Sequence, residues 1–232
     1  MGKVIAIANQ KGGVGKTTTA VNLSACLGAQ GKKTLIIDID PQGNTSSGLG
    51  IDPRDVEEST YDCLINDTPM EAVALKTDFE NLWLCPANIN LAGADLELAD
   101  MEQREFRLKK ILSSVREMFD FVLIDCPPSL SLITLNAFTA ADSVLIPIQC
   151  EYYALEGLSQ LTNTIKRTKQ ALNPKLDIEG VLLTMFDART NLSIQVVDEV
   201  KRFFAGKVYG TVIPRNVRLS EAPSFGQPII EY

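Results

Sequence analysis

Two lysines enclose three glycines in the segment that follows the first hydrophobic stretch of the chain. The segment runs from Lys11 through Gly12, Gly13, Val14, Gly15, Lys16 and Thr17 to Thr18, between an expected strand, Val4–Ala8, and an expected helix, Lys16–Gln30. Glycines let consecutive backbone N–H groups turn toward phosphate oxygens, and the helix N-terminus adds partial positive charge. In such a loop Lys16 reaches the terminal phosphates and the Thr17 hydroxyl coordinates Mg²⁺. These residues predict a site that binds ATP together with Mg²⁺.

Two aspartates mark the end of the second hydrophobic stretch, Thr34–Asp38. Asp38 and Asp40 are separated by one residue and are followed by Pro-Gln-Gly. Ligands of an α/β sheet gather at the C-terminal ends of its strands, and carboxylates two positions apart on a strand point to the same side. Both are therefore candidates for chemistry beside the phosphate loop, although a plain Asp-Pro-x-Gly turn accounts for the same residues.

A third acid ends an almost purely apolar stretch, Phe121–Asp125. A buried strand that delivers one carboxylate to its C-terminal edge is how many nucleotide-binding proteins hold Mg²⁺, usually through water. Asp125 is predicted to do this. The Pro-Pro-Ser that follows at residues 127–129 is predicted to form a stiff switch segment that senses the γ-phosphate.

Short β-branched stretches alternate with segments of helical spacing along the whole chain. This alternation predicts βαβ units in a doubly wound, mainly parallel sheet flanked by helices. The expected strands are Val4–Ala8, Thr34–Asp38, Leu82–Cys85, Phe121–Asp125, Ser143–Ile148, Val181–Met185 and Val208–Ile213. The expected helices are Lys16–Gln30, Gln103–Met118, Leu130–Ala140, Ala154–Leu172 and Ser193–Phe204. Residues 41–102 are expected to form a long, irregular, acidic excursion.

The composition fits one globular domain that spans residues 1–232. Of its 232 residues, 45% are hydrophobic and 22% are charged, which is enough to build a sizeable core. No apolar run is long enough to cross a bilayer, and the N-terminus lacks the features of a secretory signal. We therefore expect a cytoplasmic protein.

The cysteines and histidines exclude several kinds of chemistry. The five cysteines are widely spaced and never form a CxxC pair, so we expect buried free thiols rather than disulfides or a zinc site. The chain has no histidine. This excludes an imidazole general base and the commonest nitrogen ligand of transition metals.

The charge is unevenly distributed along the chain. The formal net charge is -7, yet residues 161–232 hold 10 Lys and Arg against 7 Asp and Glu. DNA binding requires cations that neutralise phosphates. A basic face in the last third of an otherwise acidic protein therefore remains open to nucleic acid.

The phosphate loop departs from the common G-x-x-x-x-G-K-[ST] pattern. Gln10 stands where that pattern has glycine, and Lys11 follows it. The resulting KGGVGKTT matches the deviant Walker A motif, and the sequence resembles the ParA/MinD family of P-loop ATPases. The resemblance implies the P-loop NTPase fold and a homodimer in which Lys11 reaches the nucleotide of the partner subunit. It also implies that Asp40 positions or activates the attacking water and that Asp38 supports the magnesium environment.

Later stretches resemble the chromosomal ParA branch of the family, often called Soj, and the similarity covers essentially the whole chain. The segments that carry it are residues 149–157, 180–190 and 213–223. The resemblance implies that Pro214 and Asn216 help to enclose the adenine and that residues 149–157 lie near the nucleotide and the dimer interface. Related chains usually continue beyond Tyr232 into a terminal helix.

The resemblance implies an ATP-dependent DNA-partitioning ATPase. The ATP-bound dimer would bind double-stranded DNA without reading its sequence and would associate with the nucleoid. Hydrolysis, stimulated by a centromere-binding partner of the ParB type, would release the DNA. Arg189 and Arg218 are the main candidates for phosphate contacts. Lys201 and Arg202 are further candidates, although a solvated helix face accounts for them equally well.

Two other classes of function share parts of these motifs. A MinD-like membrane-associated ATPase needs an amphipathic basic helix, which residues 220–232 do not supply. The other class is a metabolic or redox enzyme, such as an iron-protein reductase or a synthetase with a small-molecule substrate. An iron-protein reductase needs clustered cysteines at a dimer interface, whereas Cys126 has no second well-placed cysteine. Whether the cargo is a chromosome or a plasmid stays open.

Overall fold

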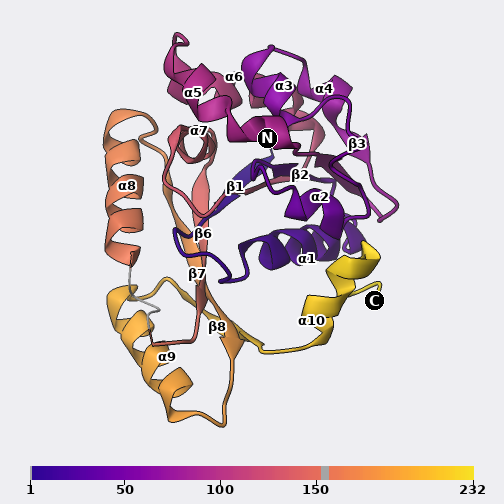
Figure 1. Cartoon of the computed structure of the whole chain (residues 1–232). Coiled ribbons are helices and arrows are strands. Elements are labelled where there is room, and N and C mark those ends of the chain that lie inside the picture. Colours follow the sequence, from indigo (N-terminus) through magenta and orange to yellow (C-terminus); the bar gives the residue numbers. More distant parts are fainter. Residues whose placement is uncertain (1, 153–156) are drawn as a thin grey trace.

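The computed structural model describes residues 2–152 and 157–232. In these residues eight strands form one sheet, in the order β3-β4-β2-β5-β1-β6-β7-β8 (Figure 1). The strands are β1 (Lys3–Ile7), β2 (Thr34–Asp38), β3 (Leu75–Lys76), β4 (Leu82–Cys85), β5 (Phe121–Asp125), β6 (Ser143–Gln149), β7 (Asp177–Phe186) and β8 (Val208–Pro214). The short β3 pairs antiparallel with β4, and the other pairs are parallel. The prediction of a doubly wound, mainly parallel α/β sheet is confirmed.

Helices connect the strands and cover both faces of the sheet. The α-helices are α1 (Lys16–Ala29), α2 (Asn44–Gly48), α3 (Thr60–Ile65), α4 (Met70–Val73), α5 (Ala94–Ala99), α6 (Arg107–Val115), α7 (Leu132–Ala140), α8 (Leu158–Ala171), α9 (Asn191–Phe203) and α10 (Arg218–Glu221). The 3₁₀ helices are η1 (Ile89–Ala92), η2 (Arg104–Phe106), η3 (Arg116–Met118) and η4 (Ala222–Phe225). Helices are present at all five positions where the sequence predicts long ones, but the segment Gln103–Met118 is divided into η2, α6 and η3. Residues 154–156 of the expected Ala154–Leu172 helix lie outside the described residues.

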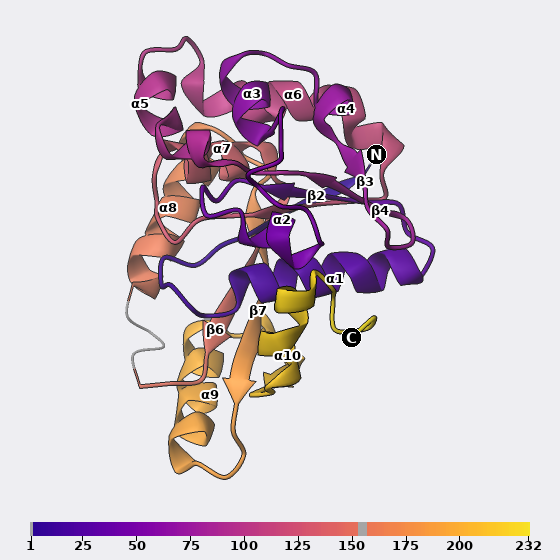
Figure 2. The ribbon, with the colours of Figure 1, turned by 45° about the vertical axis from the view of Figure 1, so that its right-hand side comes forward.

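Two hydrophobic cores lie on opposite faces of the sheet. Successive residues of a strand point to opposite faces, and in β1 Val4 and Ala6 belong to one core while Ile5 and Ile7 belong to the other. Helix α1 packs on the second face, and α3, α5, α6 and α7 cover the first (Figure 2). Burial on both faces explains why these strands are apolar at nearly every position.

Residues 41–102 are more regular than the sequence indicated. They contain four short helices, α2 to α5, together with β3 and β4. Helix α3 begins with a capping box, in which the side chains of Ser59 and Asp62 each accept from the backbone of the other. The expectation of an irregular excursion was wrong because helices of four to six residues are too short to show a hydrophobic period.

The strand order brings three strand ends together. Strand β5 lies between β1 and β2, so its last residue, Asp125, is in register with Ile7 of β1 and with Asp38 of β2. Ligands bind at such an edge, where the strand order reverses. All five cysteines are free, as expected, and four of them are buried, whereas Cys26 is only partly buried. Within the described residues, no helix has both the length and the apolar character needed to span a membrane.

Candidate nucleotide-binding site

The glycine loop between β1 and α1 has an open inner surface. Gly13 and Gly15 have φ values of 72° and 87°, in the left-handed region that glycine adopts without strain. A Cβ atom added at Gly12 or Gly13 would meet no heavy atom within 4 Å. Helix α1 begins immediately afterwards at Lys16. A helix N-terminus behind an open glycine loop is an anion-binding arrangement.

Three hydrogen bonds hold this loop in place. The Asn9 amide donates to the carbonyl of Pro147 at 2.7 Å and accepts from the Lys11 N–H at 3.0 Å. The Thr184 hydroxyl, at the end of β7, donates to the carbonyl of Val14 at 2.8 Å. Asn9 and Thr184 were missed from the sequence, because neither belongs to the glycine motif and their bonds to Pro147 and Val14 join residues 138 and 170 positions apart.

The two lysines of the motif have different environments. Lys16 is buried, and its Nζ donates to the Lys11 carbonyl oxygen at 3.1 Å. Burial lowers the pKa of Lys16, while the nearby negative charges of Asp125 and Asp40 act in the opposite direction. Lys11 is partly exposed. The Lys16 ammonium group is therefore directed into the loop, whereas the Lys11 side chain is only partly buried.

Asp125 is fully buried, and only one of its two carboxylate oxygens accepts hydrogen bonds within the described residues. Its Oδ2 accepts hydrogen bonds from the hydroxyls of Thr17 at 2.7 Å and Thr45 at 2.8 Å. Its Oδ1 is buried and has no hydrogen-bond partner within the described part of the chain. Burial raises the pKa of Asp125. A carboxylate oxygen of this kind suits a cation or a cation-bound water.

The same residues fit Mg²⁺ better than a metal that needs an all-protein cage. The described residues contain no group of three or more His, Cys, Asp and Glu side chains that would hold a metal ion. Mg²⁺ is usually held by one or two protein oxygens, several waters and the phosphates of the nucleotide. Thr17 and Asp125, next to an open phosphate loop, supply that kind of incomplete oxygen set.

Asp38 and Asp40 are close in sequence but differ in their surroundings. Asp38 is fully buried, and its Oδ2 accepts from the backbone N–H and the hydroxyl of Ser46 at 3.0 and 2.9 Å. Burial, and then the charge of Asp125, raise the pKa of Asp38. Asp40 lies beyond the end of β2, and its backbone N–H donates to Asp38 Oδ1 at 3.2 Å. Asp38 is thus fully buried at the end of β2, and Asp40 lies in the loop that follows this strand.

A cavity of about 720 Å³ opens beside the phosphate loop. Its wall includes Gly15 and Thr18 at the loop end and Pro214 and Asn216 at the end of β8. Its surface is mainly apolar, as is usual for pockets that hold the flat face of a ligand. The two residues predicted to enclose adenine therefore lie in one cavity with the loop predicted to bind phosphate.

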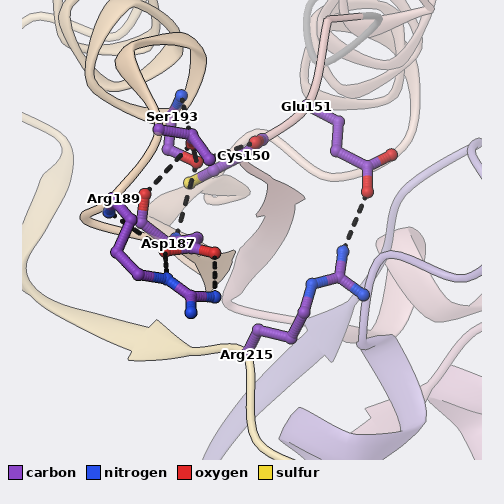
Figure 3. A network of polar contacts seen from close by, with 7 residues as sticks. Cys150, Glu151, Asp187, Arg189, Ser193 and Arg215 are labelled. Carbon is purple, nitrogen blue, oxygen red and sulfur yellow. Dashed lines mark hydrogen bonds and ion pairs between the residues drawn. The ribbon is translucent and has the colours of Figure 1, made fainter.

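Two arginines at the far edge of the sheet are paired with carboxylates (Figure 3). Arg189 donates from Nε and Nη2 to the two oxygens of Asp187, at 2.9 and 2.7 Å. Arg215 donates to Glu151 at 2.9 Å. The Arg189 side chain is 89% exposed despite its pairing. Its guanidinium therefore keeps N–H groups that face solvent.

The four cations predicted to contact DNA do not form one cluster. Arg189 precedes α9, whereas Lys201 and Arg202 lie in its last turn, about 15 Å away along the helix. Arg218 begins α10 on another segment. All four are exposed. A single protomer therefore presents them at three positions: before α9, in the last turn of α9 and at the start of α10.

Part of the segment predicted to lie near the dimer interface falls outside the described residues. Of residues 149–157, the structure describes Gln149–Tyr152 and Gly157. Gln149 is the last residue of β6, next to the end of β7, and its neighbour Cys150 donates its N–H to the Thr184 carbonyl at 3.0 Å. The described part is therefore tied to the strand that holds the phosphate loop.

Comparison with known proteins agrees with this geometry. The AAA domain family matches residues 2–178. The chain is 62% identical over 232 residues to the sporulation initiation inhibitor protein Soj of Bacillus subtilis, and the match covers 100% of this chain and 92% of the relative. It is 55% identical to the chromosome partitioning protein ParA of Myxococcus xanthus, over 100% of this chain and 82% of the relative.

A solved structure gives the same fold with nucleotide present. Cobyrinic acid a,c-diamide synthase from Mycobacterium smegmatis, with bound ADP and magnesium, has a TM-score of 0.89 and 41% identity, and the match covers 97% of this chain and 93% of that one. ATP and Mg²⁺ are the cofactors of this chain and ATP hydrolysis is its reaction, in agreement with its 53% identity over its whole length to the chromosome-partitioning ATPase Soj of Treponema pallidum. The identities to Soj and to ParA are higher than that to the synthase. The chain belongs to the AAA domain family and, within it, to the ParA/Soj chromosome-partitioning P-loop ATPases.

Proposed function

We propose that residues 1–232 act as a single ATPase domain and as a nucleotide switch for DNA segregation. Two subunits with bound Mg-ATP close face to face, and the closed dimer binds double-stranded DNA without sequence preference. Hydrolysis removes the γ-phosphate that holds the dimer together, and the separated subunits release the DNA. The name of the Myxococcus xanthus relative, chromosome partitioning protein ParA, supports this role.

The different burial of the two loop lysines carries the proposal. Lys16 is buried in its own site, while Lys11 is only partly buried and its backbone N–H donates to Asn9. An ammonium group that is not used inside its own site is available to the triphosphate of a second subunit. There it stabilises charge that develops during phosphoryl transfer. Each site would then be complete only in the dimer.

The other residues of the site follow from their positions. The backbone of residues 11–18 binds the phosphates, and Lys16 contacts the terminal ones. Thr17 and Asp125 hold Mg²⁺, with Asp38 supporting this environment through its neighbours. The bound ion neutralises phosphate charge, as in other ATPases. Asp40 orients the attacking water from the loop that follows β2.

The cavity beside the loop is the proposed adenine site. Pro214 and Asn216 form part of its wall and Thr18 lies at its phosphate end. An apolar cavity with a few polar groups fits an aromatic base that is held by stacking and one or two hydrogen bonds. Asn216→Ala should weaken the binding of ATP and ADP equally, because both carry the same base.

Pairing of the subunits is tested with variants of Lys11. In an Asp40→Ala background, which blocks hydrolysis, light scattering with Mg-ATP should give the mass of a dimer. Adding Lys11→Ala should give a monomer, while Lys32→Ala, an exposed lysine on the surface beyond α1, should leave the dimer intact. A dimer that forms equally well without the Lys11 ammonium group contradicts the proposal.

DNA binding is tested by comparing ATP, ADP and no nucleotide at two salt concentrations. Binding should require ATP and should weaken steeply with salt, because the contacts go to phosphates. Arg189→Ala and Arg218→Ala should each weaken binding and reduce the salt dependence, since each removes about one phosphate contact per subunit. Lys201→Ala and Arg202→Ala test whether α9 contributes. Equal binding with ADP and ATP would rule out the switch.

We also propose a ParB-type protein as the partner that stimulates hydrolysis, through a basic N-terminal peptide. In cells we expect the protein in the cytoplasm, associated with the nucleoid when ATP is bound. A fluorescent fusion should follow the nucleoid in the Asp40→Ala variant and become diffuse when Lys11→Ala is added. A distribution that is the same in both variants would separate localisation from the nucleotide state.

A further inference from the structure

The short helix α2 contacts two buried carboxylates with two consecutive hydroxyls. Thr45 donates to Asp125 Oδ2 at 2.8 Å, and Ser46 donates to Asp38 Oδ2 at 2.9 Å. All four side chains are fully buried. The helix follows Gly43, whose φ of 62° turns the chain from the loop of Asp40 into α2. The hydroxyls of α2 thus connect the Asp40 loop to the Mg²⁺ side of the site.

The two hydrogen bonds to Asp125 fix which of its oxygens stays free. The terminal torsion of an aspartate is broad, so a single donor leaves the carboxylate room to turn. Here Thr17 from α1 and Thr45 from α2 both donate to Oδ2. The other oxygen, Oδ1, is then held in place without a partner in the described residues.

The connection continues through the backbone toward Asp40. The N–H of Gly43 donates to the Asp40 carbonyl at 2.9 Å, and the N–H of Ser47 donates to the Gly43 carbonyl at 3.0 Å. The Ser46 hydroxyl also accepts from the Ala87 N–H at 3.1 Å. Ser46 therefore fixes α2 to Ala87. The Thr45 hydroxyl connects α2, and with it the Asp40 loop, to Asp125.

We propose that Thr45 is a positioning residue of the ATPase site. Its hydroxyl holds the Asp125 carboxylate so that Oδ1 stays available to Mg²⁺ or its water, and it ties this carboxylate to the segment that carries Asp40. The inference rests on the proposed roles of Thr17 and Asp125 at the ion. It makes Thr45 important for the response to Mg²⁺ and not for nucleotide binding as such.

The test measures the affinity for a non-hydrolysable ATP analogue with Mg²⁺ and with EDTA. Thr45→Val keeps the shape of the side chain and removes the hydroxyl. The gain in affinity that Mg²⁺ provides should fall about tenfold, the effect of one hydrogen bond to a charged group. Affinity in EDTA should stay unchanged. Thr45→Ser should restore the gain, because it restores the donor.

A matched control separates this role from general packing. Thr60 is also fully buried at the start of a short helix, where its hydroxyl donates to the carbonyl of Pro86 at 3.1 Å, away from the carboxylates. Thr60→Val should leave the Mg²⁺-dependent gain unchanged. If Thr45→Val does not fold, Thr45→Ala serves as the variant without a hydroxyl and carries the same expectation.

Asp125→Asn distinguishes failure of this inference from failure of the proposed site. If Asp125→Asn lowers the Mg²⁺-dependent gain and Thr45→Val leaves it intact, Thr45 has no positioning role and the inference is overturned. If Asp125→Asn itself leaves the gain unchanged, the assignment of Asp125 to Mg²⁺ fails first, and the inference fails with it. A Thr45→Ser variant as impaired as Thr45→Val would also overturn it.

Discussion

Replacing Thr184 with valine removes one hydroxyl from the support of the phosphate loop and leaves the side-chain shape nearly unchanged. The hydroxyl donates to the carbonyl of Val14 at 2.8 Å, and the two residues are only 4% and 1% exposed. Valine fills the same space, so no cavity forms. The Val14 carbonyl is left buried without its donor, which costs about 1–3 kcal/mol.

This cost divides between the stability of the fold and the binding of nucleotide. If the loop keeps its conformation, the nucleotide-free protein loses stability, and its Tm falls by about 2–4 °C for each kcal/mol in a chain of this size. If the Val14 peptide instead turns toward the open phosphate space, ATP binding must reverse that turn. The affinity then falls, by about tenfold for each 1.4 kcal/mol. The two losses together should amount to about 1–3 kcal/mol.

Thermal unfolding without nucleotide and titration with a non-hydrolysable ATP analogue measure the two parts separately. Thr184→Ser keeps the donor and should recover most of the loss. Thr168→Val makes the same replacement at a buried position of α8, whose hydroxyl has no hydrogen-bond partner within the described residues, and it should lower neither quantity. The reasoning is refuted if Thr184→Val, like Thr168→Val, lowers neither by more than about 0.5 kcal/mol.

Three further outcomes follow from other parts of the structure. Gly28→Ala should destabilise the protein by about 1–3 kcal/mol or more in urea unfolding, because its Cβ would lie 2.1 Å from a backbone carbonyl oxygen. Gly210→Ala, with no heavy atom within 4 Å of the new Cβ, should be close to neutral. Burial raises the pKa of Asp38. Above about pH 4 the Asp38 carboxyl therefore stays protonated in the folded protein but loses its proton in the unfolded chain. The unfolded chain then binds fewer protons, so the free energy of unfolding without nucleotide should fall as pH rises through neutral, and Asp38→Asn should reduce this slope. Asp187→Asn should strengthen ATP-dependent DNA binding by up to about fivefold in a titration at low salt, because exposed pairs like that with Arg189 contribute only about 0–1 kcal/mol.

The residues of the site that could be predicted from the sequence are those that lie next to one another along the chain. The glycine loop, Lys16 and Thr17 form one motif whose physical requirements are met by adjacent residues. Asp125 could be identified because a carboxylate at the end of a buried apolar strand is costly unless it binds a partner. Thr45 and Thr184 could not, because their hydrogen bonds join residues 80 and 170 positions apart. Only the packed fold shows which hydroxyls meet which acceptors.

The fold shows the same division. The buried strands were predictable because both of their faces are covered, which requires an apolar residue at nearly every position. The insertion of β5 between β1 and β2 was not, since strand order depends on how the helices pack across the sheet. The four DNA candidates illustrate the limit for surface residues. Net charge in a sequence segment indicates that cations are present, but it does not show that Lys201 lies a helix length away from Arg189.

Strand β5 comes after β1 and β2 in the chain but lies between them in the sheet. This position explains why one carboxylate, that of Asp125, contacts several segments of the site. With β1 and β2 as direct neighbours, Asp125 would lie outside the pair of strands that lead into the phosphate loop and the Asp40 loop. Between them, it receives Thr17 from the helix after β1 and Thr45 from the helix after β2. A change at the phosphates therefore has a short physical route, through two hydroxyls on one oxygen, to the segment that carries Asp40. Strand order, rather than any single motif, brings the three parts of the site into contact.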